Sequence, residues 1–195
     1  IATLPDFNLR MAETGAVLIH YRARFAKLLS RYASAAHGEC SGGREELTVS
    51  YRTVKTVSDP FGDHKLLVLQ LLEHPREHHY AEISSRQCLS GPHKDEIEVQ
   101  LDGISARSYA SQGQTRTAAL SLKLAAREIH KEIIGEYPIL LLDDVLSELD
   151  PKRQEYVLNR LGSGQVFITC CEEDRLHSLL KGNVYRVSDG VISSP

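Results

Sequence analysis

The sequence has 195 residues, of which 42% are hydrophobic and 25% are charged, and its formal net charge is −3 at pH 7. These values suit one domain, or two small ones, and they exclude a polybasic nucleic-acid arm or membrane-surface segment. The longest apolar run, residues 138–142, has the length of a strand rather than of a membrane span, so we expect no membrane partner. The sequence opens on Ile1 without an initiator Met, and we expect it to be part of something longer.

The first 90 residues predict a mostly helical region. Apolar side chains at spacings of three and four predict a helix over residues 12–36, and we expect the following residues to form its core stripe: Leu18, Tyr21, Phe25, Leu28, Leu29 and Tyr32. Four basic residues lie between them and either contact phosphates or form a solvated face: Arg22, Arg24, Lys27 and Arg31. A strand is expected over 46–52, followed by a loop. Residues 64–86 are expected to form either one helix or two helices separated at Pro75.

The remaining residues alternate between strands and helices, which favours an α/β fold with a largely parallel sheet. The expected helices cover residues 114–134, 151–161 and 172–180, and the expected strands cover residues 97–101, 104–109, 139–142, 166–169, 184–187 and 191–192.

Two carboxylates follow an apolar strand. Asp143 and Asp144 come directly after residues 139–142, and ligands of open α/β sheets bind at the carboxyl ends of strands. This is the pattern of a Walker B site, in which the first carboxylate holds Mg²⁺ and the second orients or deprotonates an attacking water. Taken alone the pattern is weak, because apolar strands often end in acids.

A second motif lies about 30 residues upstream. Ser111-Gln112-Gly113-Gln114 opens the predicted 114–134 helix, and a small polar residue and a glycine at a helix N-terminus can form an anion site. Ser147, Glu148, Leu149 and Asp150 follow the paired acids. The combined order resembles the signature motif, Walker B motif and D-loop of ABC-type ATPases.

The amino-acid sequences of these motifs resemble those of the RecF family of SMC-like ATPases. The resemblance rests on residues 110–117 (ASQGQTRT), residues 141–150 (LLDDVLSELD) and residues 91–96 (GPHKDE), whereas the first 90 residues match only by layout. It implies a bacterial recombination mediator, cytoplasmic and nucleoid-associated, that acts on DNA (duplex or single-strand/double-strand junctions) in gap repair and replication restart. It also implies two parts: a helical arm lobe over residues 1–88 and the C-terminal half of an ATPase head over residues 89–195.

The resemblance further implies roles for individual residues. Asp143 would bind Mg²⁺, and Asp144 would be catalytic in the place usually held by Glu, which suits slow hydrolysis. Residues of the signature motif and D-loop would contact ATP across a head-to-head dimer of two copies: Ser111, Gln112, Gly113, Gln114, Ser147 and Asp150. Thr169 replaces a switch histidine, either as a γ-phosphate sensor or as a strand-end residue. Mediator proteins of RecR and RecO type are the implied partners.

The sequence departs from a complete ATPase in one respect. It contains no G-x-x-x-x-G-K-[ST] phosphate loop, so we expect these residues alone to bind ATP weakly or not at all. Whether the chain is an enzyme therefore stays open. The alternatives are another SMC-like chromosomal ATPase and a non-catalytic module that binds DNA or mediator proteins.

Three smaller sets of residues also raise hypotheses. The cluster of histidines at residues 74–79 is expected to be a solvated helix end rather than a metal site. His93 either touches a nucleotide or partner subunit or fixes a turn. The four cysteines are expected to be buried, reduced thiols.

Overall fold

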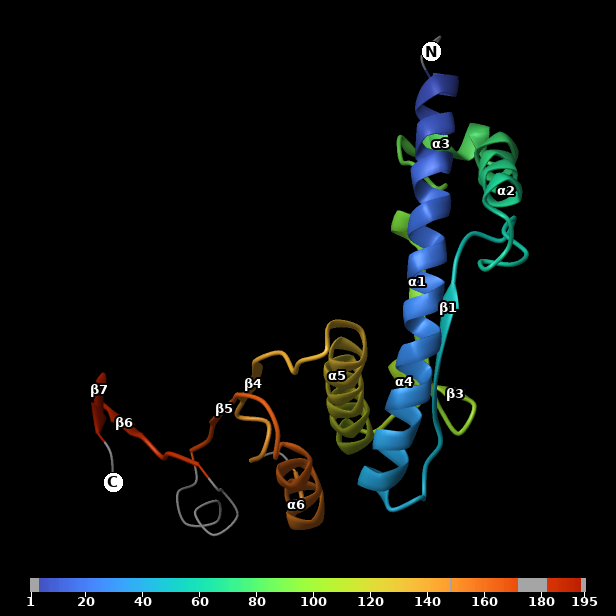
Figure 1. The fold of residues 1–195 in the computed structure, drawn as a ribbon. Helices are drawn as coiled ribbons and strands as arrows, with labels where there is room; N and C mark the ends of the chain where they lie inside the picture. The colour runs from blue at the N-terminus through green and yellow to red at the C-terminus, as the bar shows by residue number, and fades with distance from the viewer. Residues whose placement is uncertain (1–3, 148, 172–181, 194–195) are drawn as a thin grey trace. The chain divides into compact units, whose positions relative to one another are not determined.

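The computed structural model describes residues 4–147, 149–171 and 182–193, and the chain divides into two compact units, Ile1–Gly135 and Glu136–Pro195 (Figure 1). The expected lobes, residues 1–88 and 89–195, do not coincide with these units, because a strand after residue 89 pairs with one before it. That division into arm and head remains a prediction about function. None of the helices among the described residues is long and apolar enough to cross a membrane.

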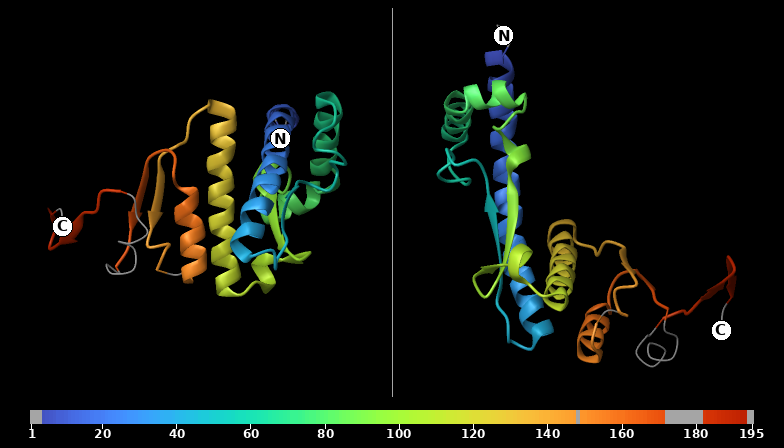
Figure 2. Two further views of the ribbon diagram at one scale, coloured as in Figure 1. Left: turned by 60° about the horizontal axis from the view of Figure 1, so that its bottom comes forward. Right: turned by 180° about the vertical axis from the view of Figure 1, so that it is seen from behind.

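The first unit is built along one long helix, α1 (Leu4–Ser41), which extends well beyond the predicted residues 12–36. In both views of Figure 2, strands and further helices lie alongside it. The helix ends at Gly42 and Gly43, whose φ angles of 68° and 72° lie in the left-handed region. Glycine adopts this conformation without steric cost, so the pair can reverse the chain into the next strand.

The buried face of α1 differs from the prediction. Tyr21 is 66% exposed, Leu18 and Phe25 are 40% exposed, and of the expected stripe only Leu29 is buried. The face that packs against the rest of the unit is made mainly of small residues: Ala12, Gly15, Ala16, Ile19, Ala23, Ala26, Ala33 and Ala36. Alanine permits close approach between elements, and this is the reason that the larger side chains lie outside the contact.

A three-stranded antiparallel sheet lies beside the second half of α1. Its order is β1 (Leu47–Arg52), β2 (Glu96–Leu101) and β3 (Ile104–Ser105), with Leu47 opposite Leu101 and Val49 opposite Val99. The long helix α5 (Gln112–Ile134) completes this part and ends at Gly135, as predicted. These elements share one hydrophobic core, made of Leu29, Ala33, Leu47, Val49, Leu101, Ala118, Ala125 and Ile129.

The strand predicted for residues 104–109 is correct for two residues only. After β3 the chain turns into the short helix α4 (Ala106–Tyr109), which is followed by Ser111 and α5. The sheet therefore ends early, and α4 connects it to the signature motif.

The first half of α1 packs against α2 (His64–Glu77), around a second core that includes Ile19, Leu67 and Leu71. Pro75 lies inside α2 and does not break it. Its ring is buried on the same face as Leu71, so apolar contact offsets the missing hydrogen bond. The helix ends at Glu77, and after the single residue His78 the chain continues as α3 (His79–Ser85).

The second unit contains β4 (Leu140–Asp143) and β5 (Val166–Thr169), which pair in parallel, with α6 (Pro151–Arg160) between them in sequence. A hairpin of β6 (Arg186–Ser188) and β7 (Val191–Ser193) follows. Among the described strands only β4 and β5 are parallel and the other pairs are antiparallel, so the expectation of a largely parallel sheet is wrong for this part of the chain. The helix expected at residues 172–180 lies outside the described residues.

Candidate functional site: the signature helix and the paired acids

The signature motif forms a capping box at the start of α5. Ser111 is the N-cap residue, and its hydroxyl accepts a hydrogen bond of 3.3 Å from the amide of Gln114. In return, Oε1 of Gln114 accepts from the amide of Ser111 at 2.9 Å. This reciprocal arrangement satisfies two amides at a helix N-terminus and fixes the path of the turn that carries Ser111.

Gly113 has open space around it. A Cβ atom at this position would meet no atom within 4 Å among the described residues, and the φ angle of Gly113 is not in the left-handed region. Neither packing nor backbone conformation in the described chain therefore requires glycine, which disfavours the helix by about 1 kcal/mol relative to alanine.

A polar network that the motif analysis missed supports this turn. Nε2 of Gln114 donates to Oε1 of Glu45 at 3.1 Å, and Oε2 of Glu45 lies 3.1 Å from Nε2 of His37. The His37 ring is completely buried, and its Nδ1 lies 3.3 Å from the hydroxyl of Ser121. Residues 45 and 114 are far apart in sequence, so no local pattern predicts this contact.

In the second unit, the paired acids lie at the carboxyl end of β4, as predicted. Oδ1 of Asp143 accepts a hydrogen bond of 2.5 Å from the hydroxyl of Thr169, the last residue of β5. The amide of Asp144 donates to that same hydroxyl at 3.0 Å and lies 3.2 Å from the carbonyl oxygen of Thr169. Asp144 has a φ of 51°, which turns the chain sharply away from the strand.

The D-loop that follows is held by apolar anchors. Leu146 and Leu149 are buried, while Ser147 and Asp150 are exposed. The Ser147 hydroxyl lies 2.8 Å from both the carbonyl oxygen and Oδ1 of Asp144. The loop therefore presents Ser147 and Asp150 outward, beside two buried leucines.

Asp150 is the N-cap residue of α6. Its carboxylate accepts from the amides of Lys152 and Arg153, at 3.1 and 3.2 Å, and pairs with the Arg153 guanidinium at 3.0 Å. Pro151 occupies the first turn, as predicted for a helix start. The carboxylate thus has a structural role in addition to the expected role at a dimer interface.

The predicted site residues fall into two groups, one in each unit. The second unit brings together Asp143, Asp144, Ser147 and Thr169, and the first unit contains residues 111–114. Carboxylate oxygens are the ligands that Mg²⁺ prefers, and both acids are exposed at the strand end, so this donor set fits the ion. The sequence contains no G-x-x-x-x-G-K-[ST] motif.

The segment at residues 91–95 packs against α1. Gly91 has a φ of 113°, and the Pro92 ring lies over Gly15, where a Cβ atom would come within 3.2 Å of it. Nε2 of His93 lies 3.0 Å from the carbonyl oxygen of Cys88, which supports the turn-fixing role of this histidine. Arg22, one of the four basic residues of the predicted helix, donates to the carbonyl oxygen of Pro92 at 2.5 Å. This side chain therefore joins α1 to the 91–95 segment.

The histidine cluster is only partly solvated, contrary to expectation. His74 is buried, and its Nδ1 lies 2.8 Å from the hydroxyl of Ser90. The rings of His74 and His78 stack in parallel, with centroids 4.1 Å apart, so their nitrogens do not converge on one point. Of the four cysteines, all of them reduced, only Cys40 is buried, so the expectation of buried thiols is wrong for the other three.

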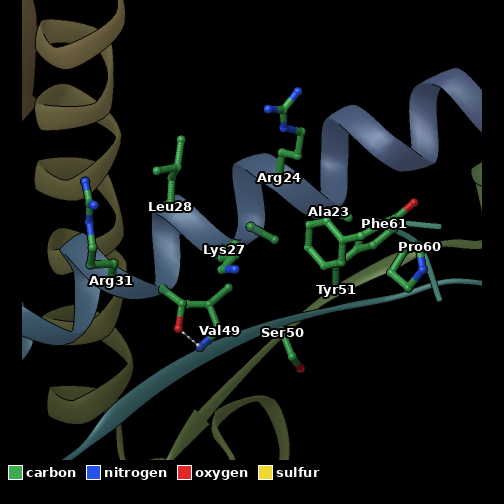
Figure 3. A pocket seen from close by; sticks show the side chains of 12 residues that line it. Ala23, Arg24, Lys27, Leu28, Arg31, Val49, Ser50, Tyr51, Pro60 and Phe61 are labelled. Atoms are coloured by element: carbon green, nitrogen blue, oxygen red, sulfur yellow. Dashed lines mark hydrogen bonds between the residues drawn. The ribbon is translucent and has the colours of Figure 1, made fainter. Parts of the chain in front are cut away.

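A cleft of about 840 Å³ lies between α1, β1 and the loop at Pro60 and Phe61 (Figure 3). Three cations line it: Arg24, Lys27 and Arg31. The structure describes all of its lining residues, and none of them is an acid. Nζ of Lys27 lies 5.7 Å from the centroid of the Phe61 ring, and Arg31 pairs with Glu132 at 2.9 Å. The cleft therefore combines positive charge with the aromatic faces of Tyr51 and Phe61.

The fold and its site define a class. This α/β chain, with paired acids at a strand end and a signature-type capped helix, has the fold of the C-terminal half of an ABC-type ATPase.

The particular proteins that it matches are RecF proteins. The chain is 40% identical over 191 residues to the DNA replication and repair protein RecF of Clostridium perfringens (strain SM101 / Type A), covering 97% of this chain and 51% of that protein. It is 40% identical over 188 residues to RecF of Bacillus subtilis (strain 168), covering 94% of this chain and 50% of that protein. The chain thus spans about half the length of the curated relatives it matches. No protein-family model matches it.

Solved structures agree with this result. A structure of "the recombination mediator protein RecF-ATPrS in RecFOR pathway" has a TM-score of 0.85 and 32% identity, covering 99% of this chain and 50% of that chain. The corresponding RecF-ATP structure has a TM-score of 0.84, also at 32% identity, covering 100% of this chain and 51% of that chain.

Proposed function

We propose that the chain supplies the signature, Mg²⁺-binding and D-loop groups of an ATP-dependent DNA recombination mediator in gap repair and replication restart. The observation that carries this proposal is the strand-end cluster, in which Thr169 joins the Asp143 carboxylate to the Asp144 backbone. Such a cluster is suited to phosphoryl transfer, in which the protein mainly positions and stabilises charge. Location at the bacterial nucleoid in the cytoplasm is part of the proposal.

The residues of this chain have distinct roles in it. Asp143 holds Mg²⁺, which when bound would stabilise negative charge on the phosphates. Asp144 orients or deprotonates the attacking water, and its short side chain suits slow turnover. In a head-to-head dimer, ATP is surrounded by residues of the signature motif, the D-loop and the end of β5: Ser111, Gln112, Gly113, Gln114, Ser147, Asp150 and Thr169. The open space at Gly113 supports such an approach by a second copy.

DNA is the proposed macromolecular ligand, and the cleft beside α1 is the candidate contact surface. Arg22 and Arg31 are committed to neighbouring groups, so Arg24 and Lys27 are the cations of α1 that we assign to phosphate contacts. Changing both to alanine should weaken DNA binding and lower the slope of affinity against salt concentration by about two. Lys65→Ala, outside the cleft, is the matched control. Equal DNA affinity and salt slope in all three proteins would contradict this assignment.

Partners of RecR and RecO type complete the proposal, since the matched structures are named for the RecFOR pathway. Binding of purified mediator proteins to the full-length product of the gene, with and without ATP, tests this part.

The central experiment changes the first acid in the full-length product of the gene. Asp143→Asn keeps the shape of the side chain and removes its charge, and we expect ATP hydrolysis to fall at least tenfold while the protein remains folded. Glu155→Gln, an exposed acid on α6, is the control and should leave hydrolysis unchanged. DNA binding that is independent of ATP, with no hydrolysis in the unchanged protein, would instead favour the non-catalytic module.

A further inference from the structure

The turn that carries the signature motif is connected to the interior of the first unit by hydrogen bonds rather than by apolar contact alone. Gln114 uses both ends of its amide: Oε1 accepts from the Ser111 amide, and Nε2 donates to Glu45. Rotation of this side chain toward any ligand would break both bonds. Its geometry is that of a group holding the turn, not of a group reaching out of it.

Glu45 is the centre of this connection. Its two carboxylate oxygens face different partners, Nε2 of Gln114 on one side and the His37 ring on the other, each at 3.1 Å. Its side chain is 18% exposed, so these bonds are partly shielded from water, and bonds to a charged acceptor are the stronger kind.

His37 connects the carboxylate to the interior. The ring is fully buried between Glu45 and Ser121, and the Ser121 hydroxyl lies 2.8 Å from the carbonyl oxygen of Thr117, one turn earlier in α5. The series of contacts therefore starts on α1, crosses the loop before β1 and returns to α5 at two points. The two points are Gln114 and Ser121, which are seven residues apart and therefore lie on one face of α5.

We propose that Glu45 and His37 are positioning residues for the nucleotide-facing signature turn, acting through Gln114 on the amide and hydroxyl of Ser111. This rests on the proposed function, because the turn has a catalytic purpose only if ATP joins two copies. Gln114 lies beside ATP in the proposed dimer, and the hydrogen bonds of its side chain hold the turn in place. Loss of the carboxylate frees the Gln114 amide, and the Ser111 turn samples other conformations before a second copy can bind.

The test uses the full-length product of the gene and three variants in the same loop. Glu45→Ala removes both acceptors, Glu45→Gln retains one oxygen that can accept from Gln114, and Glu46→Ala removes a neighbouring exposed acid as a control. We expect Glu45→Ala to weaken ATP-dependent dimerisation, measured by sedimentation, about tenfold, with Glu45→Gln in between and the control unchanged.

A second measurement does not depend on ATP. Hydrogen–deuterium exchange of residues 109–115 should become faster in Glu45→Ala, while exchange in β1 and in the second half of α5 stays the same. A general loss of stability would instead raise exchange throughout the unit. If alanine at position 45 prevents folding, Glu45→Met, of similar volume, is used for both measurements.

The outcomes separate the two proposals. Absence of ATP-dependent dimers in the unchanged protein would overturn the proposed function. Dimers that form equally well in Glu45→Ala and Glu46→Ala, with unchanged exchange at residues 109–115, would overturn the positioning role alone.

Discussion

The hydroxyl of Thr169 lies 2.5 Å from Oδ1 of Asp143 and connects the ends of two parallel strands. The same oxygen accepts from the Asp144 amide, so one side chain orients the carboxylate of the first acid and the backbone of the second. The family resemblance left two roles open for Thr169, a γ-phosphate sensor or a strand-end residue. In this structure its hydroxyl faces the acids.

Removing that hydroxyl should therefore affect the use of Mg²⁺. In the full-length product of the gene, we expect Thr169→Val, which keeps the shape, to raise the Mg²⁺ concentration needed for half-maximal ATP hydrolysis several-fold. Thr169→Ser keeps the hydroxyl and should restore most of the activity. A valine variant with an unchanged Mg²⁺ requirement but poorer ATP affinity would instead indicate the phosphate sensor.

Gly113→Ala should separate stability from function. Because a methyl group at this position meets no described atom, the substitution should leave the free energy of unfolding unchanged or raise it by up to about 1 kcal/mol. ATP-dependent dimerisation should nevertheless be lost, since in the proposed dimer the methyl group would face the nucleotide. Gly38→Ala, in an equally open position inside α1, is the control: it should change the free energy of unfolding in the same direction and leave dimerisation unchanged. Normal dimerisation of Gly113→Ala would contradict the assignment.

The buried histidine on α2 predicts a loss of stability in mild acid. Burial of His74 disfavours its charged form and lowers its pKa, and the neighbouring His78 adds to the effect. In the unfolded chain, the pKa returns to about 6.5, so the unfolded state binds more protons below that pH. Stability from this group is fully present above pH 6.5 and is lost as the pH falls through the lower folded-state pKa.

Thermal unfolding at pH 7.5 and 5.5 measures this effect. His74→Gln, which keeps a hydrogen-bonding group for Ser90 but does not titrate, should show a smaller drop in melting temperature between the two values. His64→Gln, at an exposed position, should behave like the unchanged protein. An equal drop in all three proteins would assign the acid sensitivity to other groups.

The β4–β5 pair predicts self-association of the 195-residue chain. Leu141 and Phe167 are register partners, and they are 70% and 52% exposed. An apolar sheet face of this kind favours contact with another copy. Leu141→Glu should lower the average mass in solution, while Leu69→Glu, at a similarly exposed position on α2, should not. A chain that remains monomeric without any substitution would contradict this expectation.

Local sequence signals predicted the elements that depend on local physics. Helix α5 has an N-cap Ser111, a regular apolar period and a terminal Gly135, and the structure confirms it almost to the residue. The strand that ends at Asp143 was predictable for the same reason, since a short apolar run ended in charge. The strand predicted after the Asp102-Gly103 turn was mostly wrong, because a good turn signal does not fix how far the pairing continues.

Features that depend on distant contacts could not be predicted in this way. The packing face of α1 was missed because alanine contributes little to an apolar pattern, although it allows the closest approach between elements. In the sequence, nothing distinguishes Glu45 from other acidic residues of loops, and only the folded chain brings its carboxylate to the side chain of Gln114. His74 lies in a polar stretch, and its buried partner Ser90 is 16 residues away, so the residues around it in sequence do not indicate its burial.

Helix α1 is continuous over 38 residues, so at 1.5 Å per residue it is about 57 Å long. One end lies beside α5 and the other beside α2. If a helix of this length tilts by about 5° about one end, its other end moves by about 5 Å. A small displacement of α5 that tilts α1 would thereby be amplified at α2.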